Sequence, residues 1–377
     1  MRKKLINMTE SEFNESLTED VKTFKDLKEE IIDSGECCSC GACVAYCESQ
    51  SFDVIDMYED IPQFKSSKNE ENCTECGLCY FICPQTEPLL DLIMNKNKAR
   101  DELGQVLEVI AAKTSDKAIA EVGQDGGIIT TILNYLFLSN KIDAAIVSEH
   151  DESMKPIPKI IFDRDELLKS AGTRYTISPN ILALKEIYNL SSDIMKQKEI
   201  YDIDQLRVAF VGTPCQCRAI DKMKYLSVKP AHVIKYVIGL FCFENFYYEK
   251  LVDTIKKETD LAPSKIKKTV IKKNFFVIDE NEEKFEINIK KFDECVRDHC
   301  HICDEFTAKY TDVSVGASGA PEGYSIVLVR TKKGSDLMRV LLSLGYIEEY
   351  LVPAGKKLDW KQKKLDLYRK MISYKTK

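Results

Sequence analysis

The sequence predicts two parts of different fold class: a small, cysteine-dense α+β domain and then a larger, mixed α/β domain. Nine of the 15 cysteines lie between Cys37 and Cys83, and the other six lie between Cys215 and Cys303. After residue 105, short apolar segments alternate with helical patterns, which is typical of a largely parallel or mixed sheet covered on both faces. The polar segment 95–104 separates these patterns, and we expect the domain boundary there.

Net charge, cysteine count and the length of the apolar runs exclude several classes of protein. The 377 residues carry a net charge of −7, which argues against a nucleic-acid binder. An odd number of cysteines and the lack of a signal peptide argue against a secreted disulfide framework. No apolar run approaches the ~20 residues of a membrane span. We therefore expect a cytoplasmic protein that reaches the inner face of a membrane only through a partner.

The two ends of the chain are expected to be helical. In the N-terminal extension, residues 1–34, apolar side chains recur at three- and four-residue steps, and Thr9 and Glu12 are spaced like a capping box. This helix is expected to pack on its own protein in preference to a partner. The basic C-terminal tail, residues 351–377, is expected to form a solvated helix in preference to a docking element.

The larger domain, residues 105–350, is expected to alternate strands and helices. Strands are predicted at 106–112, 144–147, 208–211, 233–241 and 325–329. Helices are predicted at 126–138 and 181–190. Segments 275–278 and 285–289 flank an acidic turn and predict a β-hairpin.

Residues 35–100 carry two cysteine tetrads with the same spacing. The tetrads are Cys37, Cys40, Cys43, Cys47 and Cys73, Cys76, Cys79, Cys83, each C-x2-C-x2-C-x3-C, with Pro84 behind the second. Three cysteines of such a run wrap around one [4Fe-4S] cluster and the fourth ligates the other cluster. The sequence thus predicts a bacterial-type 2[4Fe-4S] ferredoxin domain. One cluster is assigned Cys37, Cys40, Cys43 and Cys83, and the second is assigned Cys73, Cys76, Cys79 and Cys47.

Zinc is the competing interpretation of these cysteines. A zinc site usually takes two separated C-x2-C pairs for one ion, whereas these tetrads are compact and the second ends in Cys-Pro. Two details depart from the ferredoxin pattern. Glu48, and not proline, follows Cys47, and Cys38 is an extra thiol beside Cys37. The spacing favours Cys37 as the ligand.

Several short motifs follow in a fixed order in the larger domain. They are Gln124-Asp125-Gly126-Gly127, Gly172-Thr173-Arg174-Tyr175, Val211-Gly212-Thr213-Pro214-Cys215-Gln216, Gly239-Leu240-Phe241-Cys242, Cys300-His301-Ile302-Cys303-Asp304, Asp312-Val313-Ser314-Val315-Gly316 and Gly323-Tyr324-Ser325. In this order they resemble the beta-subunit family of coenzyme F420 hydrogenases and dehydrogenases, over roughly residues 106–335. With a ferredoxin domain in front, the layout resembles the electron-input subunit of the F420 dehydrogenase of methanogenic archaea and the N-terminal half of F420-dependent sulfite reductase.

The resemblance implies FAD and iron–sulfur clusters as cofactors and coenzyme F420 as substrate. Residue patterns support this more weakly: Gly126-Gly127 opens an apolar helix that suits a phosphate, and strand 208–211 runs into a Gly-Thr-Pro loop where α/β sheets bind ligands. Arg174 is expected to pair with a phosphate and Tyr175 to stack on a ring. A glycine loop at 316–324 is expected to cover a flat ring. The cofactor-binding candidates are Gln124, Asp125, Gly126, Gly127, Ile128, Thr130, Thr173, Arg174, Tyr175, Ser178, Gly212, Thr213, Pro214, Gln216, Gly316, Ser318, Gly319, Gly323 and Tyr324.

A third [4Fe-4S] cluster is predicted in the larger domain. Cys215 and Cys242 each follow the carboxyl end of an apolar strand, and Cys300 and Cys303 form a C-x2-C pair, so loops at one sheet edge are expected to bring these four together. Cys295 is the rival ligand. Cys217 is expected to be an ordinary thiol, and His299 and His301 to be neighbours of the cluster and not ligands.

These parts imply an oxidoreductase. A flavin converts a two-electron hydride from reduced coenzyme F420 into single electrons for clusters and a partner complex. Little acid–base chemistry is required, and no catalytic residue is assigned. The alternatives are a beta subunit of an F420-reducing formate dehydrogenase or hydrogenase with the reverse flow, an electron-transfer adaptor without flavin, and a zinc-binding interaction module.

Overall fold

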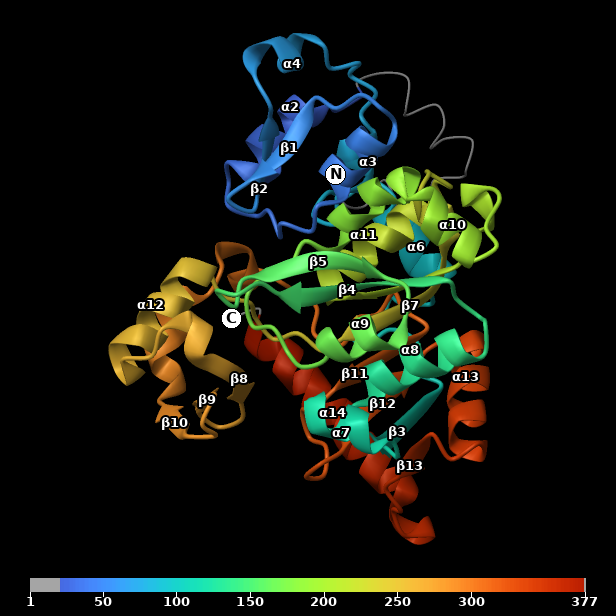
Figure 1. The fold of residues 1–377 in the computed structure, drawn as a ribbon, viewed down its shortest axis with the longest axis vertical. Coiled ribbons are helices and arrows are strands. Elements are labelled where there is room, and N and C mark those ends of the chain that lie inside the picture. Colours follow the sequence, from blue (N-terminus) through green and yellow to red (C-terminus); the bar gives the residue numbers. More distant parts are fainter. Residues whose placement is uncertain (1–20, 376–377) are drawn as a thin grey trace.

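The computed structural model describes residues 21–375 and consists of a cysteine-dense N-terminal module packed on a larger α/β domain (Figure 1). Most of the predicted N-terminal helix, including Thr9 and Glu12, lies outside the described residues. Its last part forms α2 (Phe24–Leu27), which continues into a π-helical turn, η2 (Lys28–Ile32). Thr23 caps α2 in a capping box with Asp26. Phe24 and Leu27 are buried against the module, so this part packs on its own protein as expected.

The N-terminal module is built from short elements around its cysteines. They are α3 (Ala42–Ser49), β1 (Ile55–Tyr58), β2 (Ile61–Phe64), α4 (Ser67–Glu71), α5 (Leu78–Ile82) and α6 (Leu90–Lys96), with β1 and β2 antiparallel. Gly41 and Gly77 stand at the N-caps of α3 and α5, with φ of +82° and +72°. Because a side chain is strained at this φ, glycine lets each cysteine loop turn directly into a helix.

The larger domain is organised around an eight-stranded mixed sheet in the order β13-β3-β12-β11-β7-β6-β4-β5. The strands are β3 (Glu108–Thr114), β4 (Ala144–His150), β5 (Pro156–Ile161), β6 (Val208–Gly212), β7 (Ile234–Leu240), β11 (Val313–Gly316), β12 (Ser325–Val329) and β13 (Ile347–Glu349). Neighbours among β4, β6, β7 and β11 are parallel, and the outer pairs are antiparallel. The prediction of a mixed sheet is confirmed.

Helices cover both faces of this sheet. They are α7 (Lys117–Val122), α8 (Ile128–Leu138), α9 (Arg164–Lys169), α10 (Ser192–Gln197), α11 (Pro214–Tyr225) and α13 (Lys332–Ser343), with short 3-10 turns η4 (Ile203–Gln205) and η5 (Ala231–Val233). Alternate residues of β6 enter opposite cores: Phe210 packs with α11, whereas Val211 packs with α8 and α13. The helix predicted at 181–190 is instead a 3-10 helix, η3 (Asn180–Asn189).

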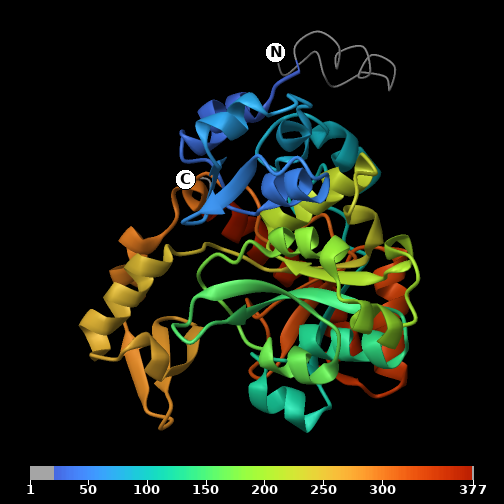
Figure 2. The ribbon, with the colours of Figure 1, turned by 45° about the horizontal axis from the view of Figure 1, so that its top comes forward.

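A separate lobe is inserted between β7 and β11, at the left of Figure 1 and below the N-terminal module in Figure 2. It contains α12 (Tyr248–Thr259), η6 (Pro263–Lys265), β8 (Ile266–Ile271), β9 (Phe275–Asp279), β10 (Lys284–Ile287), η7 (Ile289–Cys295) and η8 (Asp298–His301). The predicted hairpin is β9–β10, and β8 adds a third strand that the sequence did not predict. The lobe has its own core around Phe275 and Phe292.

The C-terminal tail forms a short turn, η9 (Ala354–Lys356), and α14 (Lys357–Lys375). The expectation of a solvated helix is wrong, because Tyr368, Ile372 and Lys375 are buried. Apolar residues at helical spacing, among them Leu367 and Met371, pack α14 against β3, β12 and Phe306. Among the described residues, no helix is long and apolar enough to cross a membrane.

Candidate functional site

The two N-terminal tetrads form two small cavities with the predicted partition of cysteines. Cys37, Cys40, Cys43 and Cys83 line one cavity together with the extra thiol Cys38, and Cys47, Cys73, Cys76 and Cys79 line the other. Each set therefore combines three cysteines of one run with the fourth of the other run. Burial is the main cause that raises the pKa of Cys83 to about 11. A thiolate there needs a compensating positive charge, which metal ions supply, so the donor sets fit iron–sulfur clusters.

A third cysteine group lies where strands of the large sheet end. Cys215 is in the first turn of α11 after β6, Cys242 follows β7, and Cys300 and Cys303 come from η8 and the loop behind it. Burial raises the pKa of Cys242; Lys375 lowers it, and the sulfurs of Cys300, Cys215 and Cys303 raise it further.

Hydrogen-bond donors surround this third group. Asn245 donates its backbone N–H to Cys300 Sγ and its side-chain Nδ2 to Cys242 Sγ, both at 3.3 Å. Lys375 Nζ donates to Cys303 Sγ at 3.3 Å. Burial by itself lowers the pKa of Lys375, but the neighbouring cysteines, Cys303 first, outweigh it and raise the pKa above its usual value.

Of the three remaining cysteines, Cys295 and Cys217 lie apart from these sets and Cys38 does not. Cys295, the rival ligand, is buried in the core of the lobe with its sulfur 3.4 Å from Thr254 Oγ1. Cys217 is fully buried on α11 and donates to Gly212 O, as expected of an ordinary thiol. The sulfurs of Cys38 and Cys215 and a ring nitrogen of His299 all lie within 4.8 Å of one another. Cys38 thus lies between the first tetrad and the third group.

A cavity of about 670 Å³ opens at the carboxyl edge of the sheet and reaches Cys242. This is the edge at which parallel α/β sheets bind ligands, and the volume suits a cofactor. Of the predicted cofactor-binding residues, those that line it are Gln124, Asp125, Gly127, Ile128, Thr130, Thr173, Arg174, Tyr175, Ser178, Thr213, Gln216, Gly316 and Ser318.

Two polar side chains of this cavity keep an unsatisfied buried atom. Arg174 Nη1 donates to the carbonyls of Ser170, Ala171 and Gly172 at 2.6–2.8 Å, but its Nε has no hydrogen-bond partner within residues 21–375. Burial lowers the pKa of Arg174 to about 10. Gln124 Oε1 is also buried without a partner in this described part of the chain. Because unpaired buried polar atoms are costly, a bound group with an anionic oxygen and a donor would fit here, beside the N-terminus of α8.

Other cavity residues hold the loops in place. Gln216 Oε1 accepts from Thr213 N at 3.1 Å, and its Nε2 donates to Ser178 O at 2.5 Å. Tyr175, expected to stack on a ring, accepts a hydrogen bond from Ile271 N at 2.9 Å and packs against Phe275. Its ring is thus fixed to the lobe.

Six predicted cofactor-binding residues lie outside the cavity lining: Gly126, Gly212, Pro214, Gly319, Gly323 and Tyr324. Gly126 serves close packing, because a Cβ there would lie 2.4 Å from Ala112 O. Gly319 lies under α14, whose Lys364 donates to its carbonyl. Tyr324 packs against Tyr350 at 5.4 Å between ring centroids. The 316–324 loop is therefore held by α14 and Tyr350, and only its first part reaches the cavity.

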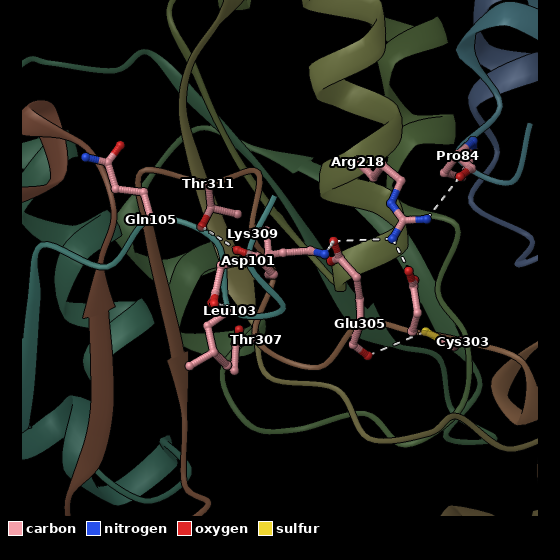
Figure 3. A network of polar contacts seen from close by, with 12 residues as sticks. Pro84, Asp101, Leu103, Gln105, Arg218, Cys303, Glu305, Thr307, Lys309 and Thr311 are labelled. Atoms are coloured by element: carbon pink, nitrogen blue, oxygen red, sulfur yellow. Dashed lines mark hydrogen bonds and ion pairs between the residues drawn. The ribbon is translucent and has the colours of Figure 1, made fainter. Parts of the chain in front are cut away.

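Arg218 on α11 joins the segment behind Cys303 to the N-terminal module (Figure 3), and Lys222 on the same helix adds contacts to that module. Arg218 donates to Pro84 O at 3.3 Å and to Asp304 at 2.9 Å, and its guanidinium also faces Glu305 at 3.3 Å. Lys222 Nζ donates to Cys83 O at 2.6 Å and to Thr86 O at 2.7 Å. Sequence reasoning missed both residues and Lys375. The available signal was the spacing of Arg218 and Lys222 three and seven residues after Cys215, which places all three on one helix face.

The mixed α/β domain thus has a cavity at its carboxyl edge, next to grouped cysteines, which is where sheets of this class bind ligands. Two family models for the beta subunit of coenzyme F420 hydrogenase/dehydrogenase match this domain. The model of its N-terminal part matches residues 109–185, and the model of its C-terminal part matches residues 205–353. The chain belongs to this beta-subunit family, which implies F420-linked redox electron transfer.

Individual relatives carry the likeness over a larger share of the chain than the two family models do. The coenzyme F420 hydrogenase subunit beta of Methanosarcina barkeri is 31% identical, covering 72% of this chain and 89% of its own. The coenzyme F420-dependent sulfite reductase of Methanocaldococcus jannaschii is 31% identical over 82% of this chain, which spans only 46% of that protein. A chain of the F420-reducing [NiFe] hydrogenase complex from M. barkeri has a TM-score of 0.62 at 28% identity, covering 73% of this chain and 90% of its own.

Proposed function

We propose that the protein oxidises reduced coenzyme F420 at FAD bound in the sheet-edge cavity and passes single electrons through three [4Fe-4S] clusters to a partner. The observation that carries this proposal is the order of the sites. Cys242 lines the cavity and belongs to the third cysteine group. Cys38 lines the cavity of the first tetrad, and its sulfur lies within 4.8 Å of the sulfur of Cys215. The second tetrad follows, and its Cys76 is exposed.

In this proposal the cofactors supply the redox chemistry, and the protein chain binds and orients them. FAD accepts a hydride and releases electrons singly, which no side chain of this protein does. The chain supplies binding, orientation and exclusion of water. Arg174 Nε and the N-terminus of α8 would hold phosphate oxygens, and Gln124 Oε1 would accept from a donor of the cofactor. Phe241, Phe243 and Phe306 line the cavity next to Cys242 and limit access of water to the third group.

The extent of the likeness to relatives supports a ferredoxin-type front module. Residues 105–377 make up less than three quarters of the chain, so the 82% covered by the sulfite reductase alignment includes part of the cysteine-dense module. A component of the F420H2 dehydrogenase of Methanosarcina mazei covers 81% at 28% identity. The alignment to the hydrogenase beta chain covers only 72%. This difference favours an electron-input role with additional clusters.

An assay with reduced coenzyme F420 and a one-electron dye tests the proposal. Protein purified without oxygen is expected to contain releasable FAD and about 12 irons per chain, as three four-iron clusters require, and to reduce the dye. Flavin-loaded protein that leaves the dye unreduced would contradict the proposal. Cluster absorbance without FAD would indicate the adaptor, and zinc without acid-labile sulfide would indicate the interaction module.

The reverse flow is the second candidate. It is favoured by the fold likeness to one chain of an F420-reducing hydrogenase complex. This protein covers 90% of that one chain. Purification from the native cell separates the two directions. A hydrogen- or formate-oxidising protein that accompanies the chain would support F420 reduction, whereas a membrane-bound or sulfite-reducing acceptor complex would support F420H2 oxidation.

A further inference from the structure

The C-terminal helix carries a buried cation to the third cysteine group. Lys375, at the end of α14, is 7% exposed. Its Nζ donates to Glu305 O at 2.6 Å, to Cys242 O at 3.2 Å and to Cys303 Sγ at 3.3 Å. One ammonium therefore bonds to both cysteine loops of this group, one from after β7 and one from after η8.

Several contacts of α14 fix this position. Tyr368 is fully buried and donates its hydroxyl to Ser318 O at 3.0 Å, and Ile372 packs in the same core one turn later. Met371 and Tyr374 line the sheet-edge cavity. By contrast, the side chains of Lys357 and Lys363 on the same helix are 63% and 73% exposed. Lys375 thus differs in environment from the solvated lysines of the tail.

The hydrogen-bond acceptors of Lys375 do not themselves neutralise the charge of its ammonium group. They are two backbone carbonyls and a sulfur, and none is a carboxylate. A buried cation is costly unless an anion compensates it. A cluster bound by four thiolates supplies that charge, and each electron it accepts adds to it. An ammonium bonded to a ligand sulfur stabilises the reduced form more than the oxidised form.

We propose that Lys375 is a positioning residue that raises the reduction potential of the third cluster, so that α14 belongs to the electron-transfer machinery. The inference rests on the proposed function, since it requires a cluster at Cys215, Cys242, Cys300 and Cys303. The first tetrad offers a contrast within the molecule. Its nearby lysine, Lys222, donates to the carbonyl of Cys83 and not to a ligand sulfur.

An EPR-monitored potentiometric titration of the full chain, purified without oxygen, tests the inference on K375M, K375Q and K375R. Three one-electron transitions are expected in the wild type. In K375M and K375Q, one transition should become about tenfold less favourable, about 59 mV lower for one electron, while the other two stay unchanged. K375R should restore most of the wild-type value. The control K363M removes an exposed charge from the same helix and should leave all three transitions unchanged.

The outcomes separate the inference from the proposed function. A wild-type chain with full iron content in only two clusters would overturn the proposed third cluster itself. Wild-type potentials in K375M and K375Q with iron content retained would overturn the role of Lys375 alone. Selective loss of the third cluster from K375M and K375Q would overturn tuning of the potential in favour of a purely structural role.

Discussion

The N-terminal module and the large domain each gather cysteines, but by different means. In the module, each cavity takes three cysteines that lie three residues apart in one loop, and Cys47 and Cys83 each line the cavity of the other run. In the large domain, the sheet collects Cys215, Cys242 and Cys300 from segments that are far apart in sequence. The module therefore depends on local spacing, whereas the third group depends on topology and on helices that pack from outside. The two regions should respond differently to substitution.

The largest expected effect comes from Cys303. Cys303→Ala should remove the third cluster and slow electron transfer from the flavin to the N-terminal clusters by more than about 100-fold, because the path loses its middle step. Flavin reduction by reduced coenzyme F420 should continue. Stopped-flow absorbance at flavin and cluster wavelengths measures both rates. The matched variant Cys79→Ala should keep the transfer from the flavin to the third cluster. Equal transfer rates in the two variants would show that the two cysteine regions do not differ in this role.

Removal of the Lys222 side chain should destabilise the interface between the N-terminal module and the large domain. Lys222→Met leaves the carbonyls of Cys83 and Thr86 without this donor in a buried interface. We expect a loss of about 2–3 kcal/mol in the free energy of unfolding, measured by urea denaturation under anaerobic conditions. Lys229→Met, at a 52% exposed side chain, is the control and should cost less than about 0.5 kcal/mol. Equal stability of both variants would show that α11 does not secure the interface.

Substitution of Arg174 tests whether the cavity of the large domain binds FAD. Arg174→Met removes the buried Nε that has no protein partner, and FAD affinity should fall about tenfold, corresponding to about 1.4 kcal/mol. Fluorescence of released FAD during dilution measures this change. The iron content of the two N-terminal clusters should stay the same. Unchanged FAD binding would place the phosphates elsewhere.

The smallest expected effect is at Tyr324, where motif and geometry disagree. The motif made Tyr324 a cofactor-binding candidate, whereas its ring packs on Tyr350 outside the cavity lining. Tyr324→Ala should change FAD affinity by less than about twofold, as expected of a residue without contact. A tenfold loss would favour the motif over the geometry.

The sequence was sufficient where local rules apply. The cysteine spacing predicted two sets that line two separate cavities, with Cys38 beside the first, and the apolar periods predicted β6, β7 and β12 nearly to the residue. The ligand set of the third group stays a prediction. It failed where contacts are long-range. Lys375 looked like one of many lysines in a basic tail, and only the packing of Tyr368 and Ile372 places it at Cys303. Gly319 and Tyr324 looked like parts of a cofactor loop, but α14 and Tyr350 cover them.

Rapid-freeze-quench EPR after mixing the full chain with reduced coenzyme F420 tests the order of the sites most directly. The third cluster is expected to be reduced first and the N-terminal clusters later, and Cys303→Ala should keep its reduced flavin while both N-terminal clusters stay oxidised. Reduction of the N-terminal clusters at the wild-type rate in Cys303→Ala would contradict the account.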